Sequence, residues 1–147
     1  MDITVKTGDV LRETSDLAML ASFEDTPLPD DVADLLEPDD FRSRTGQTLL
    51  LYPRSAGWPR RLLLVGLGRR DQLTADILRQ AAAIAVRQAR TLQVPAVTIG
   101  VHGELPLAPD IASQALAEGL ELGAYRYWPY RTSLTNEDIF EVKHATV

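Results

Sequence analysis

The sequence predicts an α/β fold, a three-layer α/β/α sandwich around a mixed, largely parallel sheet. Short apolar runs of five to seven residues recur along the chain, a pattern typical of strands that are buried on both faces. Two longer stretches carry apolar residues at the three- and four-residue spacing of amphipathic helices. Strands that alternate with such helices indicate a parallel or mixed sheet. The length suits one domain, residues 1–147.

The first forty residues are expected to form two strands and one short helix. Ile3–Lys6 alternates apolar and polar residues and ends at a turn, and Leu17–Ala21 is a continuous apolar run. The acidic stretch 27–40 contains three prolines. Pro29 is expected near the start of its helix. The side chains expected to face inward from that helix are Val32, Leu35 and Leu36.

Two further apolar runs, Thr48–Tyr52 and Arg61–Leu67, predict strands at the centre of the sheet. The clearest helix follows over Leu73–Leu92. Thr74 is a good N-cap, and Asp76 lies in the first turn, where the helix dipole favours a negative charge. The inward positions are mostly small, which allows close packing on a sheet; they are Leu78, Ala81, Ala82, Ala85, Ala89 and Leu92.

The last third predicts a fifth strand, a second helix and a final strand. Pro95 prevents the preceding helix from continuing, and Ala96–Val101 is an apolar run. The second helix follows residue 110 and ends at Gly123. Ile139–Val147 alternates apolar and polar residues as a strand, and this pattern continues to the final residue. We therefore interpret the sequence as the first part of a longer chain. The apolar positions of the second helix are Ile111, Ala115 and Leu122, in line with Glu118, and beside them Ala112, Leu116, Gly119 and Leu120.

The composition excludes several classes of protein. Hydrophobic residues make up 45% of the chain, as in globular domains rather than disordered or fibrous chains. The absence of cysteine excludes disulfides, cysteine-bound zinc, iron–sulfur clusters and thiol nucleophiles. No apolar stretch approaches the about 18 residues of a membrane span, and no signal peptide is visible. We therefore expect a cytoplasmic protein with no membrane partner.

Charge is distributed unevenly along the chain. Residues 1–40 contain 12 acidic and 2 basic residues, whereas residues 41–100 contain 2 acidic and 10 basic residues, all of them arginine. An arginine-rich segment can form an anion-binding or nucleic-acid-binding face. We favour internal pairing with the acidic N-terminal third, because the net charge of −6 repels a polyanion at long range. The arginines expected to pair in this way are Arg42, Arg44, Arg60 and Arg61.

One glycine-rich turn lies where a phosphate-binding turn would be expected. Gly66 and Gly68 end a strand and precede a helix, but Asp71 holds the position of the third glycine in the dinucleotide fingerprint. The helix begins only at Thr74, which is too distant for a tight cradle. We interpret the segment as an ordinary strand-to-helix turn.

The remaining candidates for chemistry are few. His102 and His144 are 42 positions apart, and neither has a carboxylate at ligand spacing. The aspartate pairs at 30–31 and 39–40 are expected to be solvated rather than to bind a hard cation. No serine lies in a Gly-x-Ser-x-Gly motif. We therefore expect no catalytic residues, no cofactor-binding residues and no metal ligands in this chain.

The most unusual stretch is Tyr125–Arg131, which contains four aromatic residues and two arginines. Such a segment can stack on nucleic-acid bases. Aromatic residues and arginine also dominate the energetically important positions of protein interfaces. We favour an anchor between domains or subunits, because the stretch directly follows a helix in a chain that looks incomplete.

Several segments carry a resemblance to a known family. Arg61–Asp71 (RLLLVGLGRRD) resembles the strand and turn in the N-terminal domain of leucyl, or cytosol, aminopeptidases, and Leu73–Ala82 is similar to its following helix. Ala115–Tyr127, closed by Tyr130–Thr132, resembles that domain's last helix and aromatic exit. Phe41–Leu51, with its Thr-Gly-Gln sequence, is similar to the segment that leads into the middle strand.

The resemblance implies a macro-domain-like fold joined to a C-terminal catalytic domain that is absent from this chain. That domain binds two divalent metals, zinc or manganese, and removes N-terminal residues from peptides with metal-activated water. Its ligand motifs, such as Asn-Thr-Asp-Ala-Glu-Gly-Arg, do not occur here, and the only lysines, Lys6 and Lys143, lie in expected strands. The implied role of this chain is therefore to support a hexamer of two trimers and to shape access to the active sites. Its expected partners are the catalytic domain and further copies of itself.

Two alternatives remain. Val5–Val10 followed by Asp16–Leu20 resembles the opening of ADP-ribose-binding macro domains, where a Gly-Asp turn and an Asn-rich segment hold the ligand. Here Ala21–Glu24 contains no asparagine, since the only one is Asn136, and the clustered glycine loop for the diphosphate is missing. We therefore expect no nucleotide binding. A nucleic-acid-binding module built on the arginine-rich middle, with a precedent in some bacterial aminopeptidases that act on DNA, is the other alternative.

Overall fold

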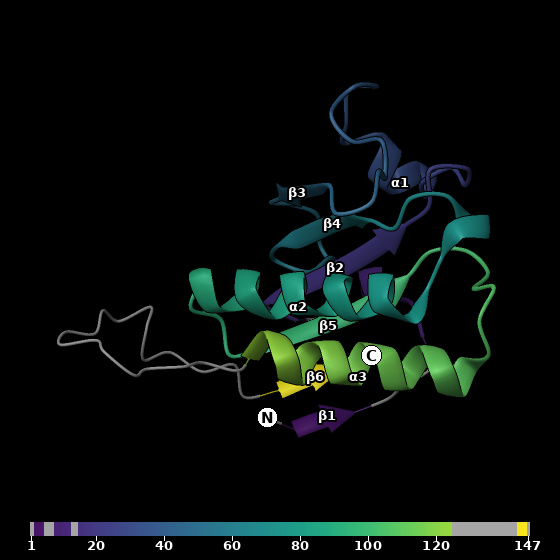
Figure 1. Cartoon of the computed structure of the whole chain (residues 1–147). Helices are drawn as coiled ribbons and strands as arrows, with labels where there is room; N and C mark the ends of the chain where they lie inside the picture. The colour runs from purple at the N-terminus through teal and green to yellow at the C-terminus, as the bar shows by residue number, and fades with distance from the viewer. Residues whose placement is uncertain (1, 5–7, 13–14, 125–143, 147) are drawn as a thin grey trace, which may run out of the picture.

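The computed structural model describes residues 2–4, 8–12, 15–124 and 144–146. Its centre is a six-stranded sheet (Figure 1). The strands are β1 (Asp2–Thr4), β2 (Leu17–Ser22), β3 (Thr48–Leu51), β4 (Leu62–Gly66), β5 (Ala96–Val101) and β6 (His144–Thr146). Their order across the sheet is β1-β6-β5-β2-β4-β3. Every neighbouring pair is parallel except β3 and β4, which are antiparallel.

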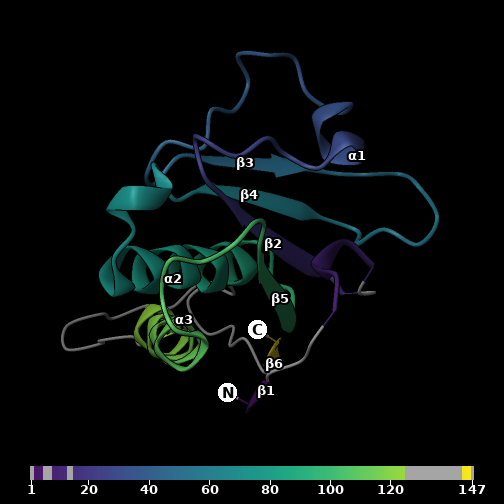
Figure 2. The same cartoon turned by 90° about the vertical axis from the view of Figure 1, so that its right-hand side faces the viewer.

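Helices cover the two faces of the sheet unequally. The long helices α2 (Ala75–Thr91) and α3 (Pro109–Ala124) lie side by side on one face (Figure 1). On the opposite face, the helical elements among the described residues are the 3₁₀ turn η1 (Val10–Arg12) and the short helix α1 (Asp30–Ala33), as Figure 2 shows. A second 3₁₀ turn, η2 (Arg70–Gln72), precedes α2. The predicted three-layer sandwich with a mixed, largely parallel sheet is confirmed.

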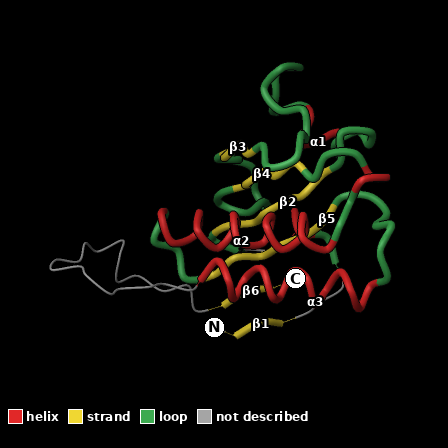
Figure 3. Tube along the Cα trace, viewed as in Figure 1, coloured by secondary structure: helices red, strands yellow, loops and turns green. Residues whose placement is uncertain are grey.

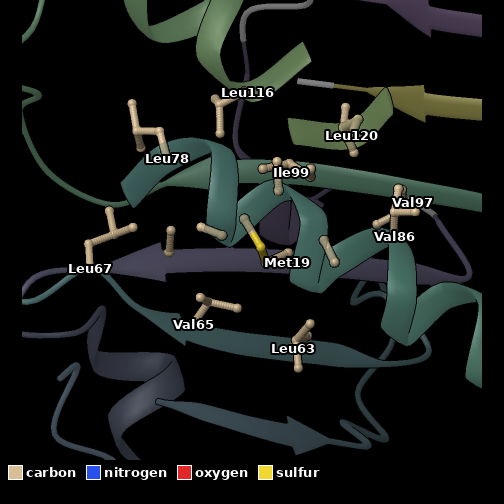
Figure 4. Packing of buried hydrophobic residues seen from close by; sticks show 14 of the residues in the cluster. Met19, Leu63, Val65, Leu67, Leu78, Val86, Val97, Ile99, Leu116 and Leu120 are labelled. Carbon is tan, nitrogen blue, oxygen red and sulfur yellow. The ribbon is translucent and has the colours of Figure 1, made fainter. Parts of the chain in front are cut away.

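The core is divided by the sheet into two hydrophobic clusters. All six residues of β2 are buried, so its alternate side chains contribute to both clusters. Figure 4 shows the larger cluster, in which strand residues such as Met19 and Leu63 meet Leu78 and Val86 of α2 and Leu116 of α3. The smaller cluster, beneath η1 and α1, includes the alternate strand residues Ala18, Leu20, Leu62 and Leu64.

Local sequence explains where α2 begins and how α2 packs. The Thr74 hydroxyl accepts a hydrogen bond from the Ile77 N–H at 3.3 Å, which confirms the predicted N-cap. Five of the six predicted inward positions are fully buried, and the sixth, Leu92, packs partly against the same cluster. In α3 the buried residues include Gly119 and Gly123, which lie against the backbone of α2.

Two placements predicted from the sequence are wrong, that of β3 and that of Leu35. β3 lies at the edge of the sheet and its residues are exposed or half-buried, because an apolar run indicates burial without indicating which strands flank it. Leu35 is 47% exposed, because α1 ends at Ala33 and the chain continues in tighter turns, in which the Leu35 N–H donates to the Val32 carbonyl oxygen at 3.0 Å. Ile111 and Leu122 are exposed, since α3 faces α2 through its small residues instead.

Parts of other predictions lie outside the described residues. These are the aromatic segment Tyr125–Arg131, residues 5–6 of the first expected strand, and residues 139–143 and 147 of the last one.

Candidate functional site

The carboxyl ends of the parallel strands are where open α/β sheets place their ligands. The loops that follow β2, β4 and β5 gather at this edge of the sheet (Figure 3, green). Beside the end of β5 lies a cavity of about 930 Å³, which we call the β5 cleft. Its walls are the turn Gly8–Arg12, the strand end Thr98–Val101, the following segment His102–Leu105 and the first turns of α3.

The cleft is lined mainly by apolar side chains, with hydroxyl groups at Thr98 and Ser113. Thr98 is 8% exposed and lines the cleft, and its side chain has no hydrogen-bond partner among the described residues. Its neighbours in sequence, Val97 and Ile99, belong to the cluster beneath α2 and α3, so Thr98 faces the η1 side of the sheet. The apolar side chains that line the cleft include Val10, Leu11 and Leu20 on the η1 side and Leu105, Leu107 and Leu116 on the α3 side.

The rim of the cleft is negatively charged. Asp9, Asp31 and Glu104 line it and are exposed, against one guanidinium from Arg12. Asp9 Oδ1 accepts a hydrogen bond from the Leu11 N–H at 3.0 Å, which fixes the carboxylate at the start of η1. The rim therefore favours a neutral or cationic ligand over an anionic one.

Two side chains tie the loops of this edge together. His102 Nε2 lies 2.9 Å from the Pro27 carbonyl oxygen, and because a carbonyl oxygen only accepts, Nε2 carries the hydrogen. The Arg70 guanidinium lies 5.2 Å from the centre of the Phe23 ring and donates to the Thr26 hydroxyl at 2.7 Å. The segment after β2 is thereby attached to the loops after β4 and β5.

The glycine-rich turn after β4 is covered and cannot cradle a phosphate. A Cβ atom at Gly66 would lie 1.9 Å from the Arg44 carbonyl oxygen, and one at Gly68 would lie 2.2 Å from the Thr45 hydroxyl. The Gly68 N–H donates to the Ser43 carbonyl oxygen at 2.9 Å. These glycines therefore allow the segment before β3 to pack closely on the turn, a reason that the sequence did not indicate.

The structure does not bring the two histidines together. His144 pairs with Ala96 at the start of β5, whereas His102 follows the end of that strand. Asp39 forms an ion pair with Arg42, and Asp40 accepts a hydrogen bond from the Glu37 N–H at 3.0 Å, both at the surface. Within the described ranges, no group of three or more His, Asp or Glu side chains could hold a metal ion. These residues therefore do not fit a two-metal centre.

The arginine-rich middle pairs in part with the acidic N-terminal third. Arg42 contacts Asp39, and Arg61 donates to the Asp16 carbonyl oxygen at 3.5 Å. Arg44 and Arg60 have no ion pair in the described structure. Of the four arginines predicted to pair with acidic side chains, only Arg42 does so in the described structure, because Arg61 bonds to a backbone carbonyl oxygen instead.

The amino-acid sequence alone did not predict the β5 cleft. Thr98 lies inside an apolar strand pattern, and the cleft is assembled from segments between residues 8 and 116. The only sequence signal was a single polar residue in a buried strand.

None of the described helices is long and apolar enough to cross a membrane.

Comparison with known proteins gives a consistent result. A sequence profile described as the cytosol aminopeptidase family, N-terminal domain, matches residues 10–134. A probable cytosol aminopeptidase of Roseiflexus castenholzii is 40% identical over 147 residues, which are 100% of this chain and 30% of that protein. One from Geobacter sp. (strain M21) is 37% identical over 100 residues, which cover 67% of this chain and 20% of that protein. The chain thus spans less than a third of the length of these relatives.

Solved structures agree on the fold. A mutant of tomato leucine aminopeptidase superposes with a TM-score of 0.74 at 18% identity, covering 99% of this chain and 31% of that one. The bottromycin maturation enzyme BotP in complex with Mn gives a TM-score of 0.68 at 23% identity, over 91% of this chain and 27% of that one. The macrodomain of Mycobacterium tuberculosis DarG gives 0.61 at 13% identity, over 99% of this chain and 96% of that one.

The last of these similarities shows that the fold is macro-domain-like, as expected from the sequence. The profile match extends over most of the chain, and the Roseiflexus relative exceeds 30% identity along all of it. The chain belongs to the cytosol aminopeptidase family, of which it forms the N-terminal domain.

Proposed function

We propose that this chain is the non-catalytic N-terminal domain of a cytoplasmic, metal-dependent leucyl aminopeptidase. The observation that carries the proposal is the 40% identity to a probable cytosol aminopeptidase along the whole chain, which covers only 30% of that protein. The chemistry then belongs to a C-terminal catalytic domain that holds two divalent ions, zinc or manganese. BotP, a fold neighbour, was solved in complex with Mn, which is in keeping with a metal in the parent enzyme.

In this proposal residues 1–147 form a single domain that contributes no catalytic, cofactor-binding or metal-binding residue. A two-metal peptidase needs several carboxylates that converge on ions about 3.5–4 Å apart. The described aspartates and glutamates form no such group. The domain instead supports a homo-oligomer, a hexamer in the full-length enzyme, and shapes access to its active sites. Nucleic acid and membranes are not among the proposed partners.

The test is the hydrolysis of leucine-p-nitroanilide by the purified chain with added zinc or manganese. We expect no turnover, and no stoichiometric metal by elemental analysis after dialysis. The same assay on a longer protein that carries the two-metal motifs is the positive control. Turnover that co-purifies with the chain and disappears when one of its own aspartates is replaced would contradict the proposal.

A further inference from the structure

We infer that the β5 cleft binds a small ligand with an apolar body and a basic amine. The inference concerns this chain alone and does not depend on peptidase activity. The cleft, at about 930 Å³, lies within the range of roughly 300–1,000 Å³ that is typical of small-molecule sites. It also lies outside the carboxyl end of a parallel strand, where ligands of α/β sheets bind.

The apolar interior determines the body of the ligand. Leucine side chains contribute from three separate segments, since Leu11 lies in η1, Leu105 follows β5 and Leu116 belongs to α3. Trp58 contributes an indole on the η1 side. A ligand that fills this space gains affinity by removing apolar surface from water. An aromatic or aliphatic body satisfies this requirement.

Thr98 is the most buried polar side chain among the described residues that line the cleft. More than nine-tenths of Thr98 is buried, yet its hydroxyl has no partner in the described structure. The hydroxyl oxygen itself is not sealed off from solvent, so it opens into the cavity, where a ligand group can replace water as its hydrogen-bond partner. A hydroxyl both donates and accepts, and therefore suits a ligand N–H or carbonyl group.

The rim determines the charge of the ligand. Three carboxylates, from Asp9, Asp31 and Glu104, face one guanidinium and one imidazole. Even with the imidazole protonated, carboxylates outnumber cations by three to two among the described residues that line the cleft. The Arg12 side chain has no ion-pair partner within the described ranges, and it is the only guanidinium among the lining residues. A phosphate or carboxylate ligand is therefore repelled, and a primary amine is attracted.

The experiment compares three indole compounds that differ in charge: tryptamine is cationic, tryptophol is neutral and indole-3-acetate is anionic. Each is titrated into the ¹⁵N-labelled chain and followed by NMR. We expect saturable binding of tryptamine below about 5 mM, weaker binding of tryptophol and the weakest binding of indole-3-acetate. The largest amide shifts are expected at Thr98, Gly100 and Gly103, and the preference for tryptamine should decrease with added salt.

Two substitutions test the named contacts. Thr98→Val keeps the shape of the side chain and removes the hydroxyl, and should weaken tryptamine binding about threefold to tenfold. Asp9→Asn keeps an oxygen that can accept the Leu11 N–H but removes the charge, and should reduce the preference for tryptamine over tryptophol. The matched control is Asp34→Asn, which removes an exposed carboxylate that does not line the β5 cleft.

The amide spectrum of each variant reports whether it is folded. The inference is overturned if no compound saturates below about 20 mM, or if the three compounds bind equally well. Shifts confined to residues away from the cleft, or a Thr98→Val chain that binds tryptamine as tightly as the original, also overturn it.

Discussion

Gly119 of α3 lies directly against the backbone of Arg79 in α2. A Cβ atom at position 119 would lie 2.2 Å from the Arg79 carbonyl oxygen, closer than any real Cβ contact. One turn later, a Cβ at Gly123 would lie 2.7 Å from the Ala83 Cα. Glycine costs helix stability, so its presence at both positions reflects the close approach of the two helices.

Gly119→Ala is therefore expected to destabilise the domain by about 2 kcal/mol, even though alanine favours the helix. The cause is the displacement of α3 from the α2 backbone. The free energy of unfolding in urea measures the effect. Glu121→Ala, at an exposed position of α3, is the matched control and should change it by less than about 0.5 kcal/mol. A Gly119→Ala chain at least as stable as the original would show that the helices can separate at no cost.

The ion pair between α2 and α3 predicts a pH dependence. The Glu118 carboxylate accepts hydrogen bonds from Arg79 Nε at 2.6 Å and from Gln114 Nε2 at 2.9 Å. These bonds, that from Arg79 most, lower the pKa of Glu118 below its ordinary value of 4.5. Because the folded-state pKa is the lower one, the stabilisation is complete above pH 4.5 and is lost as the pH falls through the folded-state value.

Glu118→Gln should remove this dependence. We expect the stability difference between the original chain and the variant to be constant between about pH 6 and 7 and to shrink below about pH 4.5. Thermal unfolding across this range measures it. Glu121→Gln is the control, since Glu121 is exposed on the same helix. If the stabilities of the original and Glu118→Gln chains changed in parallel with pH, the pH dependence could not be assigned to Glu118.

Ala85 tests the buried face of α2. It is 0% exposed within the cluster between α2 and the sheet. Ala85→Asp places an unpaired charge there and should cost on the order of 3–5 kcal/mol in chemical denaturation. Arg87→Asp, on the exposed side of the same helix, should cost less than about 1 kcal/mol. A loss below about 0.5 kcal/mol for Ala85→Asp would mean that this face tolerates a charge.

The covered glycine turn predicts that ADP-ribose does not bind. Gly66 and Gly68 are covered by Arg44 and Thr45, so their backbone cannot approach a diphosphate. The segment after β2, Phe23–Thr26, contains no asparagine and is attached to Arg70. Titration calorimetry at millimolar ligand should show no binding. A dissociation constant below about 100 μM would favour the alternative of a nucleotide-binding module.

The sequence was sufficient to predict most helices and strands, but not which strands lie next to each other in the sheet. β5 matches its predicted bounds, and the Thr74 cap and the buried alanines of α2 follow from local pattern. The position of β3 was not predictable, because three consecutive leucines look alike at the centre and at the edge of a sheet. Leu35 was misplaced because α1 ends after four residues. Helical periodicity carries no information once a helix has ended.

The candidate site could not be predicted for a different reason. Thr98 is one polar residue in an apolar strand, and its exposure to a cleft depends on what the remote turn Gly8–Arg12 and helix α3 leave open. Such a site has no motif. The glycine turn shows the converse case, since two of the three glycines of a known motif were present while their role was packing.

The pairing of β1 with β6 affects the order in which the chain can be assembled during synthesis. β1 pairs only with β6 in the described sheet, so that Asp2 lies opposite His144. Strands β2, β4 and β5 can associate once Val101 has emerged from the ribosome, whereas β1 must wait for residues 144–146. At about 5–20 residues per second, the nascent protein therefore carries an unpaired first strand for several seconds. Pairing across so long a separation is slow to nucleate, so attachment of β1 is expected to be a late step in folding.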